Sequence, residues 1–252
     1  MAHTLTKPAE LPGESPARVR GILAVAAPAP EGWEAGGIQV SRTCPSPVIR
    51  DKCISMVDEP GRPTTAEFPA FMIEQGSTCS TLSLTDRQRE AREALIASTD
   101  YALGVTLRTG EANDGAPALD DAEEVGDGAY ATAAGALAAL LCAAAAAGSG
   151  AAYVLHATPA AAVHLDAAGL IDDEGRAVNG VPFIISDGYA CEPDEAEARI
   201  WATGRVWAGV GAIDTYEAVE RRMNDREAWA ARSAIVGFNP CINLTATFTA
   251  TQ

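Results

Sequence analysis

The chain has 252 residues, 48% of them hydrophobic, so it can bury a substantial core and is not disordered throughout. Its formal net charge of −16 repels phosphate backbones at long range, which argues against a specific nucleic-acid-binding protein. The N-terminus is polar and proline-rich and does not resemble a signal peptide.

Residues 1–20 contain three prolines and no apolar periodicity, which predicts an extended arm. Residues 33–40 are predicted to form a strand broken by Gly36 and Gly37. Closely spaced Pro and Gly then separate short strand-like fragments, at residues 48–49, 54–57 and 68–73. This pattern predicts a long, irregular β-hairpin. Because such an excursion has little core of its own, we expect it to be functional or held by a partner.

Residues 84–110 are predicted to form one long helix. Thr85 and Gln88 match a capping box, Arg89 and Glu93 are spaced to pair, and Gly110 suits the end of a helix. Alanines and leucines recur at helical spacing and give one apolar stripe. An ordinary surface helix is the alternative interpretation.

The second half of the chain predicts helices and strands in alternation. The expected helices are residues 129–148 and 159–169, and the expected buried strands are residues 151–159 and 181–186. The alanine-rich run 131–147 is too short to span a membrane. Two segments, 200–206 and 207–213, could form a hairpin or one bent strand. The last strands, 229–238 and 242–248, flank an Asn-Pro turn and are expected beside the long helix.

The sequence contains little evidence of a catalytic or metal-binding site. His156 and His164 lack the spacing of a metal-binding helix pair and have no carboxylate placed to assist them. Six scattered cysteines do not form a zinc pattern and are expected to be mostly reduced, partly buried thiols. There is no nucleophile elbow and no phosphate-binding loop with Lys. The sequence therefore predicts a protein that is not an enzyme and has no cofactor, metal or catalytic site.

Three local phrases follow one another in the second half of the chain: HATPAAAVHLDAAGLIDDEGRAVNGVPFIISDGY at 156–189, IWATGRVWAGVG at 200–211 and RMNDREAWAARSAIVGFNPCINLTATF at 222–248. Their order resembles that in the HK97-like major capsid proteins of tailed phages. The resemblance implies an α+β fold and the following parts: an N-terminal arm (1–20), an E-loop hairpin region (21–83), a spine helix with part of the P-domain (84–128), an α/β A-domain (129–213) and closing P-domain strands (214–252). It is nearest to phages of high-GC actinobacterial hosts.

This resemblance implies a major capsid protein that assembles with itself, as hexamers and pentamers, into an icosahedral shell around phage dsDNA. Portal, decoration and scaffolding proteins are the implied partners, with non-specific DNA contact and no membrane. The virion is the expected location, after assembly in the host cytoplasm. Because aromatic residues, Met and Arg carry much interface energy, we expect subunit contacts through seven residues: Trp33, Phe68, Phe71, Met72, Arg87, Arg89 and Arg92. A solvated face is the alternative for the arginines.

Two departures from the capsid pattern concern processing and cross-linking. The chain begins about twenty residues before the first strand region, so we expect no large N-terminal scaffolding segment. Lys52 lies where some capsids cross-link to an Asn, here Asn239 or Asn243, but no catalytic carboxylate can be identified. A disulfide between Cys44 and Cys53, or between subunits, is the alternative to reduced thiols in the hairpin.

Two other functions compete with the capsid interpretation. One is an encapsulin-type shell that encloses cargo enzymes, which has the same fold. The other is a cytosolic α+β enzyme that depends on a thiol or a metal, for which a monodisperse protein of about 26 kDa would be evidence.

Overall fold

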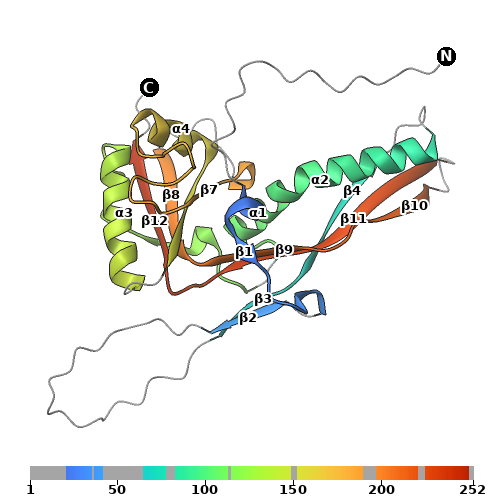
Figure 1. Cartoon of the computed structure of the whole chain (residues 1–252), viewed down its shortest axis with the longest axis horizontal. Helices are drawn as coiled ribbons and strands as arrows, with labels where there is room; N and C mark the ends of the chain where they lie inside the picture. Colours follow the sequence, from blue (N-terminus) through green and yellow to red (C-terminus); the bar gives the residue numbers. More distant parts are fainter. Residues whose placement is uncertain are drawn as a thin grey trace, which may run out of the picture.

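The structure is a computed structural model that describes residues 21–35, 37–41, 65–77, 83–112, 115–148, 152–189, 197–220 and 225–249. Two five-stranded sheets lie at either end of an elongated body, and a two-stranded ribbon projects below it (Figure 1). One long helix, α2 (Leu84–Thr109), lies along the first of these sheets and reaches the second.

The first sheet has the long strand β11 at its centre. On one side β11 pairs with β4, and on the other side with β9 and β10, while β1 extends the sheet beside β9. The face of this sheet that carries Ile73, Ala230 and Ala234 packs against Leu95, Leu103 and other apolar residues of α2. The strands are β1 (Ala27–Pro28), β4 (Phe71–Ser77), β9 (Val206–Val210), β10 (Asp214–Glu220) and β11 (Asp225–Phe238).

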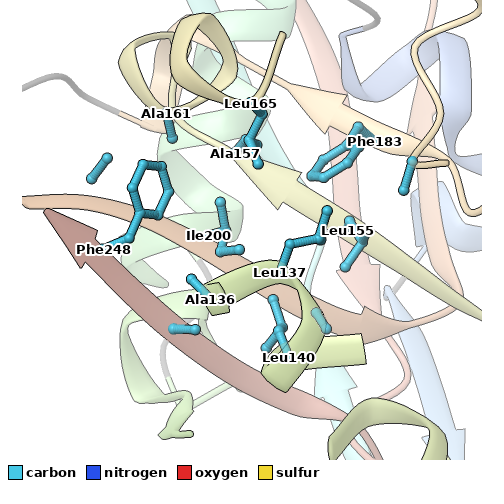
Figure 2. Packing of buried hydrophobic residues seen from close by; sticks show 14 of the residues in the cluster. Ala136, Leu137, Leu140, Leu155, Ala157, Ala161, Leu165, Phe183, Ile200 and Phe248 are labelled. Carbon is cyan, nitrogen blue, oxygen red and sulfur yellow. The ribbon is translucent and has the colours of Figure 1, made fainter. Parts of the chain in front are cut away.

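The second sheet has the order β5-β12-β8-β6-β7. Helices α3 (Ala133–Gly148) and α4 (Pro159–Ala167) cover one face, and Leu137, Leu140 and Leu165 pack there against Ile200 and Phe248 (Figure 2). The opposite face contacts the C-terminal half of α2 and the short helix η3 (Asp187–Tyr189). The strands are β5 (Glu123–Glu124), β6 (Tyr153–Ala157), β7 (Phe183–Ile185), β8 (Glu197–Gly204) and β12 (Asn243–Thr249).

The two sheets are joined by chain segments that pass directly from one to the other. β8 ends at Gly204 in the second sheet, and β9 begins at Val206 in the first. β11 and β12 make the return crossing through the turn at Asn239, whose N–H donates to the carbonyl of Arg205 at 3.0 Å. The bent-strand alternative is therefore correct for residues 200–213. The last strand, β12, pairs beside β8 and not with the other closing strands.

Helix α2 extends as predicted, but its N-cap differs from the prediction. Ser83 is the N-cap, and its hydroxyl oxygen accepts a hydrogen bond from the N–H of Asp86 at 3.2 Å. Thr85 lies inside the first turn, so the predicted capping box is wrong. At the other end Gly110 has φ +72° and donates to the carbonyl of Thr106, as expected for a glycine that ends a helix.

Several other elements differ in type or bounds from the sequence prediction. Residues 33–35 form the short helix η1 (Trp33–Ala35), so the strand predicted at 33–40 is confined to β2 (Ile38–Ser41). The strand predicted at 68–73 is split by Pro69 and Ala70 into β3 (Thr65–Phe68) and β4. The apolar run after Gly21 forms α1 (Ile22–Val25) and β1. A further short helix, η2 (Leu119–Asp121), precedes β5, and α3 begins at Ala133 instead of residue 129.

Candidate subunit-interaction surfaces

The ribbon below the body is the base of the predicted hairpin. β2 and β3 pair antiparallel, with Ile38 opposite Phe68 and Ser41 opposite Thr65, and among the described strands they pair with no third one. A small cluster of Val40, Ala66, Phe68 and Ala116 attaches the ribbon to the rest of the chain. The other strand fragments predicted for the hairpin, together with Lys52, Cys44 and Cys53, lie outside the described residues.

Two of the predicted contact residues are used inside their own chain. Phe68 is 1% exposed, and its ring lies 6.0 Å from that of Phe238 and against Gly237. The prediction that Phe68 anchors a neighbouring subunit is therefore wrong, because its surface is already buried. Trp33 is partly buried with its indole ring over Gly209, where a Cβ would lie 3.0 Å from two ring atoms.

Aromatic rings also cover glycines elsewhere on the face of the first sheet that lies away from α2. Trp229 stands opposite Gly76 in the β4–β11 pairing, and a Cβ at Gly76 would lie 3.1 Å from its ring. Tyr216 on β10 is 41% exposed, and its hydroxyl donates to Glu74 on β4 at 3.1 Å. Aromatic residues of three separate segments thus line one face, an arrangement that no local pattern predicts.

A groove of about 350 Å³ runs between β4 and the second half of α2. Phe71, Met72 and Ile73 line one side, and Tyr101, Ala102 and Val105 line the other. Met72 and Tyr101, two of its lining residues, are 58% and 55% exposed. The outer edge of β4 pairs with no other described strand. The sequence analysis named Phe71 and Met72 as contact residues, which stays a prediction. It did not name Tyr101, an aromatic residue that lies outside the apolar stripe of its helix.

The three arginines chosen on the spine helix have different surroundings. Arg87 is buried within the chain at 8% exposure, so the alternative of a solvated face is wrong for it and little of its surface is left for a subunit contact. Arg89 forms an ion pair at 3.0 Å with Asp86, one turn back, instead of the predicted pair with Glu93. Arg92 is exposed. Pairs as exposed as Arg89–Asp86 contribute little to stability.

The described part of the chain contains one fully buried histidine, His156. The Thr203 hydroxyl donates to the carbonyl of Gly204 at 3.0 Å, so its oxygen accepts from Nε2–H of His156 at 2.8 Å. Nδ1 then accepts from the hydroxyl of Tyr189, also at 2.8 Å. Burial lowers the pKa of His156 to about 3 and raises that of Tyr189. Both groups are enclosed and neutral, so this arrangement is structural and not acid–base chemistry.

Asp100 on α2 holds the N-terminal end of helix α1. Its carboxylate accepts hydrogen bonds from the N–H groups of Ile22 and Leu23, the latter at 3.2 Å. A Cβ at Gly21 would collide with this carboxylate. Burial raises the pKa of Asp100, and the hydrogen bonds it accepts oppose that rise. Gly21 and Asp100 therefore hold the N-terminal end of α1 against α2.

The cysteines depart from the expected reduced and partly buried thiols. Cys142 on α3 is a free thiol, but it is exposed. Cys241, in the turn between β11 and β12, is disulfide-bonded. Its partner lies outside the described residues.

The described residues contain no cluster of three or more His, Cys, Asp or Glu that could hold a metal ion. Within that same part of the chain, no helix is long and apolar enough to cross a membrane.

No protein-family model matches the chain, and no curated protein matches it. Solved structures do match. A chain of the capsid of a native GTA particle superposes with a TM-score of 0.59 at 12% identity, over 91% of this chain and 90% of that one. The capsid of an empty GTA particle gives 0.58 at 11% identity, over 99% and 94%. Gordonia phage Cozz gives 0.51 at 14% identity, over 85% and 81%. The predicted α+β, HK97-like capsid fold is confirmed.

Proposed function

We propose that this chain is a phage major capsid protein that assembles with itself into an icosahedral shell around dsDNA. The observation that carries the proposal is the extent of the fold match. It spans 91% of this chain and 90% of a GTA capsid chain, so it covers most of the fold and not merely one common motif. The same fold accounts for the order of phrases in the sequence.

The surfaces support this function physically. A shell subunit needs no active site, but it needs segments that reach neighbours and apolar side chains for them to cover. The β2–β3 ribbon is attached by a cluster of only a few residues. Met72, Ile96 and Tyr101 are each more than half exposed. Isolated exposed apolar residues are ordinary, but Met72 and Tyr101 share one groove beside an unpaired strand edge.

The remaining assignments follow from this proposal. Residues 1–20 act as the arm, 21–83 as the E-loop region, 84–128 as the spine, 129–213 as the A-domain and 214–252 as closing strands, of which β12 pairs in the A-domain sheet. The subunits form hexamers and pentamers in a virion assembled in the cytoplasm of an actinobacterial host. Portal, decoration or scaffolding proteins join them, and DNA contact is non-specific because the chain is strongly acidic. The role is structural and not enzymatic.

A variant that lacks residues 42–64 tests this proposal. Replacing residues 42–64 with a short Gly-Ser turn keeps the β2–β3 pairing and its attachment to Ala116. We expect a folded subunit that no longer assembles, because the removed segment acts between subunits. Sedimentation and negative-stain microscopy measure assembly, and circular dichroism measures folding. Val178→Ser, at an exposed position between α4 and β7, is the matched control and should assemble normally.

Two results would count against the proposal. Shells of normal size from the hairpin variant would show that the segment does not join subunits. Wild-type shells that enclose a specific protein and no nucleic acid, when produced in infected host cells, would favour the encapsulin-type alternative.

A further inference from the structure

We propose that Asn179 is a site of spontaneous deamidation, in which its side-chain amide is lost to attack by the backbone nitrogen of Gly180. Opening of the turn at residues 177–181 sets the rate. Asparagine is a chemically labile residue, and it reacts most readily before glycine, because glycine has no Cβ to shield the attacking nitrogen. Asn179 precedes a glycine, whereas Asn239 precedes a proline, which has no N–H, and Asn243 precedes a leucine.

The reactive pair lies at the tip of a short hairpin between α4 and β7. The N–H of Ala177 donates to the carbonyl of Val181 at 2.8 Å and closes a three-residue loop of Val178, Asn179 and Gly180. Gly180 has φ +84°, the left-handed conformation that such loops reserve for glycine. All three loop residues are exposed, and nothing lies within 4 Å of the point where a Cβ of Gly180 would be. Water therefore reaches both reacting groups.

The closed turn holds both reacting groups in place. The N–H of Gly180 donates to the carbonyl of Ala177 at 2.7 Å, and Oδ1 of Asn179 accepts from the N–H of Val181 at 3.3 Å. Deamidation requires the nitrogen of Gly180 to lose its proton and to reach Cγ of Asn179. The first hydrogen bond retains that proton, and the second holds the side-chain amide against a different N–H. The reaction therefore proceeds when the turn opens.

The stem of the hairpin is held more firmly than its tip. Oδ1 of Asp172 accepts from the N–H groups of Glu174 and Arg176 at 2.9 and 2.8 Å. Ala177 is 1% exposed and belongs to the core that contains Phe183. The tip is held only at its closing residues and is surrounded by solvent. Because exposed segments open locally at a small fraction of the free energy of global unfolding, the folded protein deamidates, but more slowly than the unfolded chain.

The reaction balances with water as the only co-reactant. The nitrogen of Gly180 forms a bond to Cγ of Asn179 and gives its proton to a solvent base. The bond from Cγ to Nδ2 breaks, and Nδ2 takes up a proton and leaves as ammonia. The five-membered succinimide ring is then opened by water. Addition at Cγ gives aspartate, and addition at the backbone carbonyl gives isoaspartate; nothing is oxidised or reduced.

The two products differ in their effect on the hairpin. The carboxylate of aspartate can still accept from the N–H of Val181, so this product keeps the turn and adds one negative charge. Isoaspartate adds a methylene to the main chain of a three-residue loop. The pairing of Ala177 with Val181 cannot then keep its register, and Ala177 is buried. Isoaspartate should therefore loosen the hairpin, whereas aspartate should not.

Time-resolved peptide mapping of the full-length protein measures the reaction. The protein is kept at mildly alkaline pH, sampled over time and digested at mildly acidic pH, so that digestion adds little product. Mass spectrometry detects the conversion, and chromatography separates aspartate from isoaspartate. A sample of the same protein in urea gives the rate in the unfolded chain. We expect conversion at Asn179 in the folded protein, several-fold slower than in urea and faster than at Asn243.

Two matched variants test the control by the turn. Asp172→Ala removes the acceptor of the stem, so deamidation of the folded protein should become several-fold faster while the rate in urea stays unchanged. Asp127→Ala removes the same charge from an exposed site that follows β5, at the opposite edge of the second sheet from β7, and should keep both wild-type rates. Asn179→Gln should give no product at this position, because glutamine would have to form a six-membered ring.

Three results would overturn the proposal: no conversion in folded wild type while the sample in urea converts, equal rates in the two samples, or an unchanged rate in folded Asp172→Ala. The comparison of folded with unfolded wild type needs no variant, so it decides even if Asp172→Ala does not fold. Shell assembly is not part of the readout, so failure of this inference is distinguishable from failure of the proposed function.

Discussion

His156 is enclosed at full burial between two hydroxyl groups that use both of its ring nitrogens. Protonating it would place a second N–H against the Tyr189 hydroxyl, which already donates to that nitrogen. The pKa of about 3 in the folded chain lies below the ordinary 6.5 of an unfolded histidine. Between these values the unfolded chain binds more protons, so His156 makes stability fall as the pH drops below 6.5, until about pH 3.

His156→Gln should therefore lower the stability at pH 7 but flatten its pH dependence. Losing the hydrogen bond to Tyr189 costs about 1–3 kcal/mol. Between pH 6 and 4 the free energy of unfolding of wild type should fall more steeply than that of the variant, by about 1.4 kcal/mol per pH unit. Denaturant titrations at several pH values measure both effects. Val178→Ser, at an exposed site without a titratable side chain, is the control and should keep the wild-type slope. An equal slope in His156→Gln would contradict the account.

Gly188 and Gly104 allow α2 to contact η3 directly. A Cβ at Gly188 would collide with the carbonyl oxygen of Tyr101, and one at Gly104 would collide with the hydroxyl of Ser186. Gly188→Ala should destabilise the protein by about 1–3 kcal/mol or more, because backbone must move, and Gly104→Ala by less. Gly135→Ala in the first turn of α3 should be neutral or stabilising. Thermal unfolding measures the melting temperatures of these three variants. Equal melting temperatures would show that the contact between α2 and η3 is not tight.

At the scale of elements, the N-cap of α2 is Ser83 in the structure, whereas the sequence analysis predicted Thr85. Ser83→Ala should cost about 1 kcal/mol, because the N–H of Asp86 loses its acceptor. Thr85→Ala should be close to neutral, since Thr85 is exposed inside the first turn. Chemical denaturation of both variants measures the difference. A larger loss of stability for Thr85→Ala than for Ser83→Ala would support Thr85 as the N-cap, as the sequence analysis predicted.

Elements with strong local signals were predictable. Periodicity and Gly110 identified α2, and Pro159 identified the start of α4, where the Thr158 hydroxyl also caps the helix. The sequence analysis did not predict β10, because its charged residues lie among its apolar ones and obscure the alternation typical of a strand. Among the candidate contact residues, Met72 was named from its residue type alone, and its role in an interface stays a prediction. Asp100 was missed because its importance depends on Gly21, which is distant in sequence.

At the scale of the whole molecule, the sequence could not show that consecutive strands belong to different sheets. Ile200–Val206 and Trp207–Ile213 have similar composition, yet β8 and β9 pair with different partners. The same holds for Phe68, whose aromatic character suits an interface but whose side chain is covered by Phe238. Such features are set by pairing between distant segments, whereas propensity and periodicity report only on neighbours in the chain.

Self-assembly is the central claim, and the mass of the purified protein in solution tests it most directly. Light scattering coupled to size-exclusion chromatography should detect closed particles of megadalton mass when the wild-type chain is expressed with the partner proteins of its head. The subunit alone has a mass of 26.0 kDa. A monodisperse species of that mass, or a dimer, at high concentration with and without those partners would contradict the account.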